Sequence, residues 1–286
     1  MNWKRAKNFM MICLIALNIV LFYLNITNSG KYIITDERKN AIFDFAEKNN
    51  IKINADIPEE FMPDRQINIK RQNYDIMELQ NIFFNNTNGL KRTEEFDKTI
   101  IVDDDESILI QNNTVSYERN SYDENFELTE EKARETGDYF LKRIGEKFVK
   151  LDADRMIKDG THYTMTYSQK LNDMKIFNNY LTVDVYEDGF ISARFTYSPV
   201  GEITGVNADI CSADEALFVF INEIGATRDN DDGIVIDKMD YGYYAFAEDI
   251  NGTVTAVPHY RIFIEGEDMP YYINAYSARP VDSNSW

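Results

Sequence analysis

The chain has 286 residues and a formal net charge of −19. Its first thirty residues hold three basic side chains, Lys4, Arg5 and Lys7, and no acidic ones, so the remainder carries −22. A surface this acidic repels nucleic acid and anionic lipid headgroups, which excludes a nucleic-acid-binding function. Hydrophobic residues make up 44% of the chain, enough to build packed cores and to exclude a disordered stalk.

An apolar segment follows the basic residues at once. Residues 9–26 contain no charge and only one strongly polar interior residue, Asn18. As a helix rising 1.5 Å per residue, this segment would be about 27 Å long, close to the thickness of the hydrocarbon core. Because the basic tail 1–8 comes first, we expect a single-pass membrane protein with a cytoplasmic N-terminus and an extracytoplasmic region from about Ser29 onward. A cleaved signal peptide is the alternative, although residues 25–30 offer no Ala-x-Ala cleavage site.

The membrane-proximal segment 27–125 is predicted to be an α+β region. Thr35 could cap a helix over residues 36–49, with Ala41, Ile42, Phe45 and Ala46 on one face, and a second helix is expected over residues 74–84. Residues 120–125 are polar and acidic and predict a linker. Short alternating runs predict strands over residues 51–53, 100–102, 107–110 and 114–117.

The remaining chain is predicted to use one plan twice, a helix followed by an antiparallel meander, as in PepSY-like repeats. The first unit, 126–200, opens on Thr129 as a cap, and its strands include a hairpin turn at Asp188–Gly189. Its helix carries an apolar stripe made of Ala133, Gly137, Phe140, Leu141, Ile144 and Phe148. The second unit, 201–286, opens on the capping-box sequence Ser212-Ala-Asp-Glu215, and Gly225 is expected to end its helix. We therefore expect the α+β fold class.

No catalytic, cofactor or metal motif is found along the chain. The two histidines, His162 and His259, lie in strand-like runs and are interpreted as packed or surface residues. The acidic clusters 103–106 and 229–233 are interpreted as solvated loops, since Arg228 occupies the first ligand position when the second cluster is aligned to a calcium loop. Cys13 lies inside the predicted membrane segment and Cys211 lies outside the membrane, so the two cannot form a disulfide. An exterior domain without a disulfide is typical of Gram-positive bacteria. We expect no catalytic residue, cofactor or metal.

The anchor itself holds the candidate functional residues. Met11, Leu14, Asn18, Leu21 and Asn25 recur at steps of three and four, which places them along one seam of a helix. An asparagine in hydrocarbon is costly unless it finds a hydrogen-bonding partner, so the seam predicts a partner helix in the membrane. The alternative is an anchor that tolerates one asparagine, with Asn25 at the interface.

Two segments resemble a known family. Residues 2–7, Asn-Trp-Lys-Arg-Ala-Lys, followed by the apolar helix, resemble the start of YycI proteins, in which Asp-Trp is the usual opening. Residues 258–262, Pro-His-Tyr-Arg-Ile, and 271–275, Tyr-Tyr-Ile-Asn-Ala, resemble the closing strands of that family, with Tyr260 where tryptophan is commoner. The resemblance covers both ends and the general layout but not residues 50–125.

The resemblance implies a non-enzymatic role at the cell membrane. A YycI-like protein would associate with the WalK (YycG) sensor histidine kinase and with the related accessory protein YycH, and would tune kinase output in cell-wall homeostasis. Two other classes stay open, a PepSY-like extracytoplasmic binding or protease-inhibitor module and a secreted cell-wall hydrolase.

Overall fold

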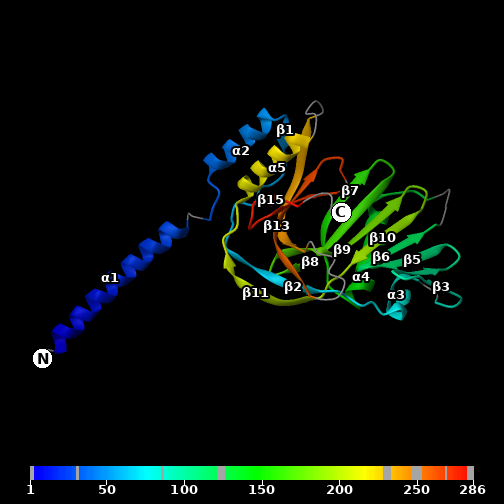
Figure 1. Ribbon diagram of the computed structural model, residues 1–286, viewed down its shortest axis with the longest axis horizontal. Coiled ribbons are helices and arrows are strands. Elements are labelled where there is room, and N and C mark those ends of the chain that lie inside the picture. The colour runs from blue at the N-terminus through cyan, green and yellow to red at the C-terminus, as the bar shows by residue number, and fades with distance from the viewer. Residues whose placement is uncertain are drawn as a thin grey trace. The chain divides into compact units, whose positions relative to one another are not determined.

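The computed structural model of the protein describes residues 3–29, 32–84, 87–120, 126–227, 233–245, 253–267 and 269–281. This described part is a mixed α+β protein, in which five helices accompany a large mixed β-sheet (Figure 1). The chain divides into two compact units. Unit 1 comprises residues 1–64, 207–240 and 260–286, and unit 2 comprises residues 65–206 and 241–259.

Two of the helices begin at capping residues that the sequence predicts. Thr35 Oγ1 accepts a hydrogen bond from the Arg38 amide at 3.4 Å, and Thr129 does the same for the Lys132 amide at 3.2 Å. The predicted stop at Gly225 is wrong, because a glycine lowers helix propensity by only about 1 kcal/mol and the helix continues through it. The helices are α1 (Trp3–Ser29), α2 (Asp36–Lys48), α3 (Ile76–Phe83), α4 (Glu130–Gly145) and α5 (Ala213–Thr227).

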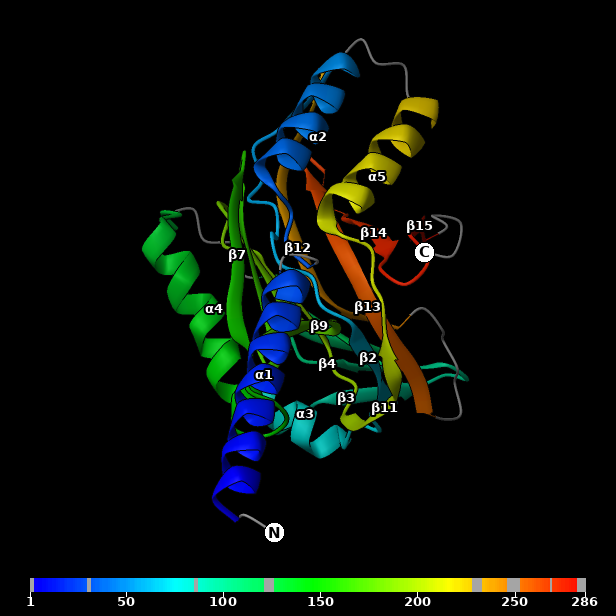
Figure 2. The ribbon, with the colours of Figure 1, turned by 90° about the vertical axis from the view of Figure 1, so that its left-hand side faces the viewer.

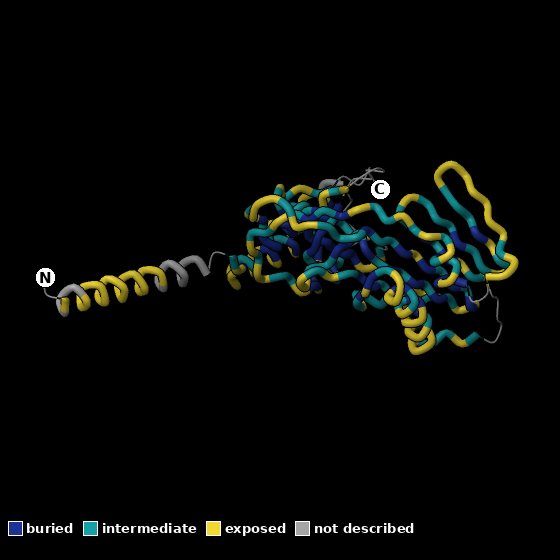
Figure 3. The backbone as a smooth tube through the Cα atoms, turned by 90° about the horizontal axis from the view of Figure 1, so that it is seen from below, coloured by how far each residue is buried: buried dark blue, intermediate teal, exposed yellow. Residues whose placement is uncertain are grey.

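Helix α1 includes the whole of the predicted segment 9–26. Its described apolar side chains, between Phe9 and Leu21, are exposed (Figure 3). Within the described residues, no helix combines the length and the apolarity needed to cross a bilayer.

The strands form where β-branched and aromatic residues alternate with polar ones. The runs predicted over 51–53, 100–102, 107–110 and 114–117 fall within β1, β4, β5 and β6. The strands are β1 (Ile51–Ile53), β2 (Asp64–Lys70), β3 (Lys91–Glu94), β4 (Lys98–Val102), β5 (Glu106–Gln111), β6 (Thr114–Arg119), β7 (Asp152–Asp159), β8 (His162–Leu171), β9 (Met174–Tyr186), β10 (Ile191–Thr196), β11 (Val200–Ala208), β12 (Ile234–Tyr244), β13 (Thr253–Ile264), β14 (Tyr271–Asn274) and β15 (Arg279–Pro280).

Unit 2 is built on antiparallel neighbours. Strands β3 to β6 form a meander, β6 pairs with β10, and β7 to β10 form a second meander after α4. The order across the sheet is β11-β2-β13-β12-β9-β10-β6-β5-β4-β3, with β7 and β8 branching from β9. The pairing of β12 with β9 is parallel, with Gly242 opposite Lys175.

The core of unit 2 lies between α4 and this sheet. The predicted α4 stripe is buried at Ala133, Gly137, Phe140 and Ile144. Leu141 is only half-buried, and the prediction that Phe148 belongs to the helix is wrong, because α4 ends at Gly145 and Phe148 packs on the core from beyond it. Gly137 is required there, because a Cβ atom at this position would collide with the Tyr167 hydroxyl. The Phe140 ring packs 5.2 Å from that of Tyr117 and 5.8 Å from that of Phe83, measured between centroids.

Unit 1 holds α1, α2, α5 and the strands β1, β14 and β15, together with parts of β11, β12 and β13. Helix α2 lies alongside α5 (Figure 2), and the rings of Phe45 and Phe218 are 4.8 Å apart. Ile42 and Ala46 of α2 are buried, but the predicted inward position of Ala41 is wrong, because the covered face of α2 is too narrow to include it. Strand β1 runs parallel to β12, with Ile51 opposite Ile234.

The predicted division into 27–125, 126–200 and 201–286 stays a prediction. The predicted linker falls outside the described residues except for Asn120. Two features of the sheet were not predicted, the parallel pairs of β12 and the strands β2, β3, β7, β11 and β15. The parallel pairs of β12 and the strands β2 and β11 depend on partners that are distant in the sequence, which local alternation does not identify. Strands β3 and β7 pair with the strand that follows each in the chain, but neither has an alternating buried face that the sequence could show.

Candidate functional site

The two histidines are placed as packing residues. His162 begins β8 and stacks on Tyr186, with 4.7 Å between ring centroids. His259 in β13 is only 2% exposed, and its Nδ1 lies 2.8 Å from the carbonyl oxygen of Val257. Burial lowers the pKa of His259 to about 4, so the ring is neutral at physiological pH and its Nδ1–H donates to this carbonyl.

The acidic clusters and the cysteine do not form a reactive centre in the described residues. Across those residues, no group of His, Cys, Asp or Glu is arranged to hold a metal ion. Asp103–Glu106 closes the turn between β4 and β5, with the Asp103 amide 2.8 Å from the Glu106 carbonyl. The cluster 229–233 lies outside the described residues except for Gly233. Burial raises the pKa of the Cys211 thiol to about 12, so it stays protonated and is a poor nucleophile.

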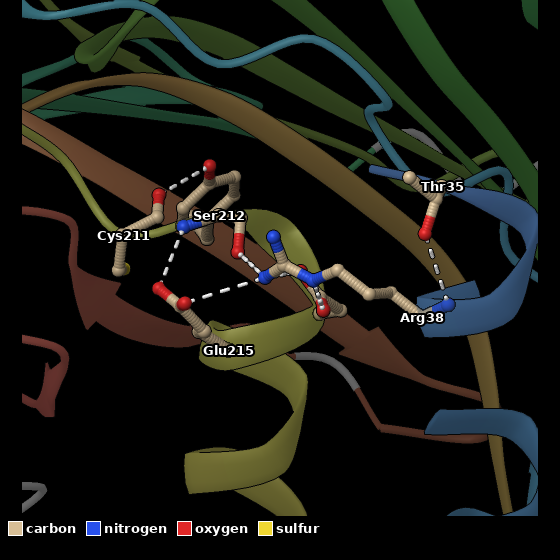
Figure 4. Close-up of polar contacts among 7 residues, drawn as sticks. Thr35, Arg38, Cys211, Ser212 and Glu215 are labelled. Atoms are coloured by element: carbon tan, nitrogen blue, oxygen red, sulfur yellow. Dashed lines mark hydrogen bonds and ion pairs between the residues drawn. The ribbon is translucent and has the colours of Figure 1, made fainter. Parts of the chain in front are cut away.

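The most distinctive polar assembly of unit 1 joins α2 to the first turn of α5 (Figure 4). Arg38 Nε donates to Asp214 Oδ2 at 2.7 Å, and Arg38 Nη2 donates to Asp214 Oδ1 at 2.8 Å. The same Nη2 donates to Ser212 Oγ at 2.6 Å and to Glu215 Oε1 at 3.3 Å. This planar, bidentate geometry is the strong form of an arginine–carboxylate pair. We call the four residues Arg38, Ser212, Asp214 and Glu215 the α2–α5 clamp.

Three residues of the clamp belong to the predicted capping box at the start of α5. The Ser212 amide donates to Glu215 Oε2 at 3.1 Å, which confirms one half of the predicted capping box. The Ser212 hydroxyl accepts from Arg38. Asp214 and Glu215 lie in the first turn, where the helix dipole favours negative charge, and Arg38 adds an opposite charge to the same turn.

The segment before α5 is fixed to strands of the same unit. The Cys211 amide donates to the carbonyl of Ala275 at 2.8 Å, and the Tyr260 hydroxyl donates to the carbonyl of Cys211 at 2.9 Å. Tyr260 is 1% exposed, and burial raises the pKa of its hydroxyl far above the ordinary value. The start of α5 is therefore held firmly on its strand side, and Arg38 adds a contact from the side of α2.

Burial differs across the clamp. The side chain of Asp214 is 12% exposed, whereas that of Arg38 is 37% exposed. An ion pair that is open to water on one side contributes only a modest free energy, about 1–3 kcal/mol when its hydrogen bonds to charged groups are included. Breaking this contact would leave the mostly buried Asp214 carboxylate without the Arg38 guanidinium, so the clamp is worth more than a fully exposed surface pair.

The predicted seam residues lie on one helix. Met11, Leu14, Asn18 and Leu21 are exposed in α1, and 3.6 residues per turn places their steps of three and four along one face. The side chain of Asn25 lies outside the described residues. The partner of this face stays a prediction. The sequence did not predict the clamp, because nothing local to Arg38 indicates a contact with Ser212, which is 174 residues away.

Comparison with known proteins gives one family and several structural likenesses, two of which are described below. The family model described as YycI protein matches residues 31–276. No curated protein sequence matches the chain significantly.

The solved structures are distant in sequence. An uncharacterized protein from Eubacterium rectale aligns with a TM-score of 0.51 and 14% identity, over 81% of this chain and 89% of that one. The C-terminal domain of Bacillus megaterium YpeB aligns with a TM-score of 0.40 and 11% identity, over 74% of this chain and 97% of that one. The first likeness supports the same overall fold and says nothing about activity.

Proposed function

Because the chain belongs to the YycI family, we propose that it is an accessory regulator of a WalK-like sensor histidine kinase. YycI proteins are membrane-anchored, non-enzymatic regulators of two-component signalling. The observation that carries the proposal is the family match over residues 31–276. We further propose that the partners in the membrane are the kinase and an YycH-like protein, and that the process served is cell-wall homeostasis in a Gram-positive bacterium.

We propose that α1 is the anchor, with residues 9–26 in the hydrocarbon and the N-terminus in the cytoplasm. Lys4, Arg5 and Lys7 before the segment support this orientation. The exposed apolar side chains between Phe9 and Leu21 support a lipid or helix environment for α1, because water disfavours such a surface. A C-terminal alkaline phosphatase fusion should then be active and a C-terminal green fluorescent protein fusion dark. The reverse pattern would contradict this orientation, and a mature protein that starts near residue 30 would favour a cleaved signal peptide.

We propose that the regulatory step is a packing equilibrium of transmembrane helices. In this proposal, the seam Met11, Leu14, Asn18, Leu21 and Asn25 packs against a helix of the kinase or of the YycH-like protein. A ligand or a wall component that acts on the extracytoplasmic region can shift this equilibrium only if it favours one packed state over the other.

We propose that the α2–α5 clamp links the packing state of α1 to the folded part of unit 1. Helix α2 begins at Asp36, soon after α1 ends at Ser29. Arg38 lies in the first turn of α2 and contacts the start of α5, which is fixed to strands through Cys211. A change in how α2 is held therefore reaches both α1, through the chain, and the packed part of unit 1, through Arg38.

We also propose that α4 with β7–β10 and α5 with β12–β15 are two copies of a PepSY-like plan. In each copy, a helix is followed along the chain by strands, and consecutive strands pair with one another. The same plan would also suit the alternative function, an extracytoplasmic binding or protease-inhibitor module. A binding module would act on a soluble target without the anchor, whereas the kinase regulator requires α1.

The experiment that separates these functions is a crosslinking pull-down from native membranes. The full-length protein should recover a sensor histidine kinase together with an YycH-like protein. Recovery of a wall-side protease or a secreted protein in their place would favour the binding module. Reproducible hydrolysis of peptidoglycan that a single carboxylate or histidine substitution abolishes would contradict the non-enzymatic role.

A further inference from the structure

A short antiparallel contact lies just after α1 in the chain. The Ile34 amide donates to the carbonyl of Glu59 at 2.9 Å, and the Phe61 amide donates to the carbonyl of Tyr32 at 3.0 Å. Ile33 is directly opposite Glu60 in this pairing. The segment that follows α1 is therefore fixed to a second segment of unit 1 immediately before α2 begins.

The two sides of this contact differ because side chains alternate along extended backbone. Tyr32 and Phe61 are opposite each other on one side, with ring centroids 5.8 Å apart in an edge-to-face arrangement. Ile33, Glu60 and Met62 fall on the other side. Ile33 is 43% exposed and Met62 is 64% exposed, so this side presents two large apolar side chains to solvent. We call Ile33, Glu60 and Met62, which share this exposed side, the interfacial patch.

The length of chain limits where the interfacial patch can be. If residue 26 marks the outer end of the hydrocarbon, α1 continues for three residues to Ser29, which adds about 4.5 Å. Three further residues reach Tyr32, and even a fully extended chain spans only about 10 Å there. The headgroup layer outside the hydrocarbon is itself about 5–8 Å thick. The patch is therefore tethered within a short distance of the lipid interface.

We propose that the interfacial patch rests on the outer surface of the bilayer, with Ile33 and Met62 reaching the boundary between headgroups and acyl chains. This inference rests on the proposed anchoring by α1. Apolar side chains are favoured at this depth. The bilayer that fits is zwitterionic, because the strongly acidic region outside the membrane repels anionic headgroups and Glu60 is directly opposite Ile33 on the same side of the contact. Glu60 also limits the depth, since a carboxylate avoids hydrocarbon.

The consequence concerns the start of α2. Ile34 is the last residue of the paired segment, Thr35 caps α2, and Arg38 of the clamp lies in the first turn of α2. Lipid contact at the interfacial patch would hold this segment from the membrane side. The packing of the lipid headgroups would then affect how the α2–α5 clamp is held, as would a rotation or displacement of α1.

Tryptophan quenching by brominated lipids tests this on the full-length protein. The chain has two tryptophans, Trp3 and Trp286. The variant Trp286→Phe keeps Trp3 as the sole indole and reports insertion of α1. The variant Trp3→Phe/Trp286→Phe/Met62→Trp reports the patch, and the same background with Met269→Trp is the matched control, because Met269 is a 65% exposed methionine of unit 1 outside the patch. Ile33→Trp in that background is a second reporter of the patch.

Each variant is reconstituted in phosphatidylcholine vesicles with bromine near the headgroup end of the acyl chains. We expect Trp3 and the indoles of Met62→Trp and Ile33→Trp to lose most of their emission, and the indole of Met269→Trp to keep it. Quenching of Trp3 with both patch variants emitting like Met269→Trp would overturn the patch and leave the anchor intact. An unquenched Trp3 would overturn the anchor, and the patch with it.

Discussion

Helices α4 and α2 are both attached along one face, but by different kinds of contact. Helix α4 buries Ala133, Gly137, Phe140 and Ile144 in the core of unit 2. Helix α2 buries only Ile42 and Ala46 and adds the polar clamp through Arg38. Releasing the apolar face of α4 would expose it to water at about 25 cal/mol for each Å². The clamp contributes less, about 1–3 kcal/mol, through an arginine whose side chain is 37% exposed. Helix α2 is thus the element suited to move with α1.

The apolar attachment of α4 should give the largest loss when it is broken. Phe140→Ala removes a ring that is 3% exposed and packs on Tyr117 and Phe83, and we expect a loss of about 3–5 kcal/mol in the free energy of unfolding. The measurement is urea unfolding of the detergent-solubilised full-length protein. Tyr139→Ala is the control on the same helix, because Tyr139 is 41% exposed, and it should cost less than about 1 kcal/mol. Similar losses for both variants would contradict the assigned face of α4.

Breaking the clamp should cost less. Arg38→Met keeps the length of the side chain but removes every donor to Asp214, Ser212 and Glu215, and we expect a loss of about 1–3 kcal/mol. The matched control is Arg134→Met, since Arg134 forms an exposed pair with Glu130 within α4, worth about 0.3–0.5 kcal/mol. The same denaturation measurement applies. Equal effects of the two substitutions would show that the clamp contributes no more than a surface pair.

The buried histidine makes the stability of unit 2 depend on pH. The pKa of His259 is lowered from 6.5 to about 4 in the folded protein, so the unfolded chain binds more protons between these values. Stability from this group is therefore complete above pH 6.5 and decreases as the pH falls toward 4, by up to about 1.4 kcal/mol per pH unit. His259→Gln should flatten this part of the pH profile relative to the natural protein. A pH profile that keeps its full slope in His259→Gln would contradict the assignment.

The contrast between α4 and α2 also shows what the sequence could predict. The caps Thr35 and Thr129 and the stripe of α4 were predicted because each depends on residues within a few positions of one another. The clamp was not, because Arg38 finds Asp214 only after α2 and α5 have been brought together. The parallel pairing of Gly242 with Lys175 was missed for the same reason. Local pattern predicts an element and its buried face, whereas the choice of partner depends on the whole fold.

The central claim is that the protein acts on the kinase through the seam of α1. Asn18→Leu keeps the apolar character of the helix and removes the one hydrogen-bonding side chain in the middle of the predicted span. It should leave insertion intact and weaken helix association by about 0.6–2 kcal/mol, a change of about threefold to thirtyfold in the association constant.

The most direct measurement is the yield of the crosslinked complex with the sensor histidine kinase in native membranes. Asn18→Leu is compared with Ile12→Leu and Ile19→Leu, which alter positions outside the seam. We expect a reduced yield for Asn18→Leu and an unchanged yield for the two isoleucine variants. The same yield for all three would contradict the seam, and the coupling would then have to run through the extracytoplasmic units.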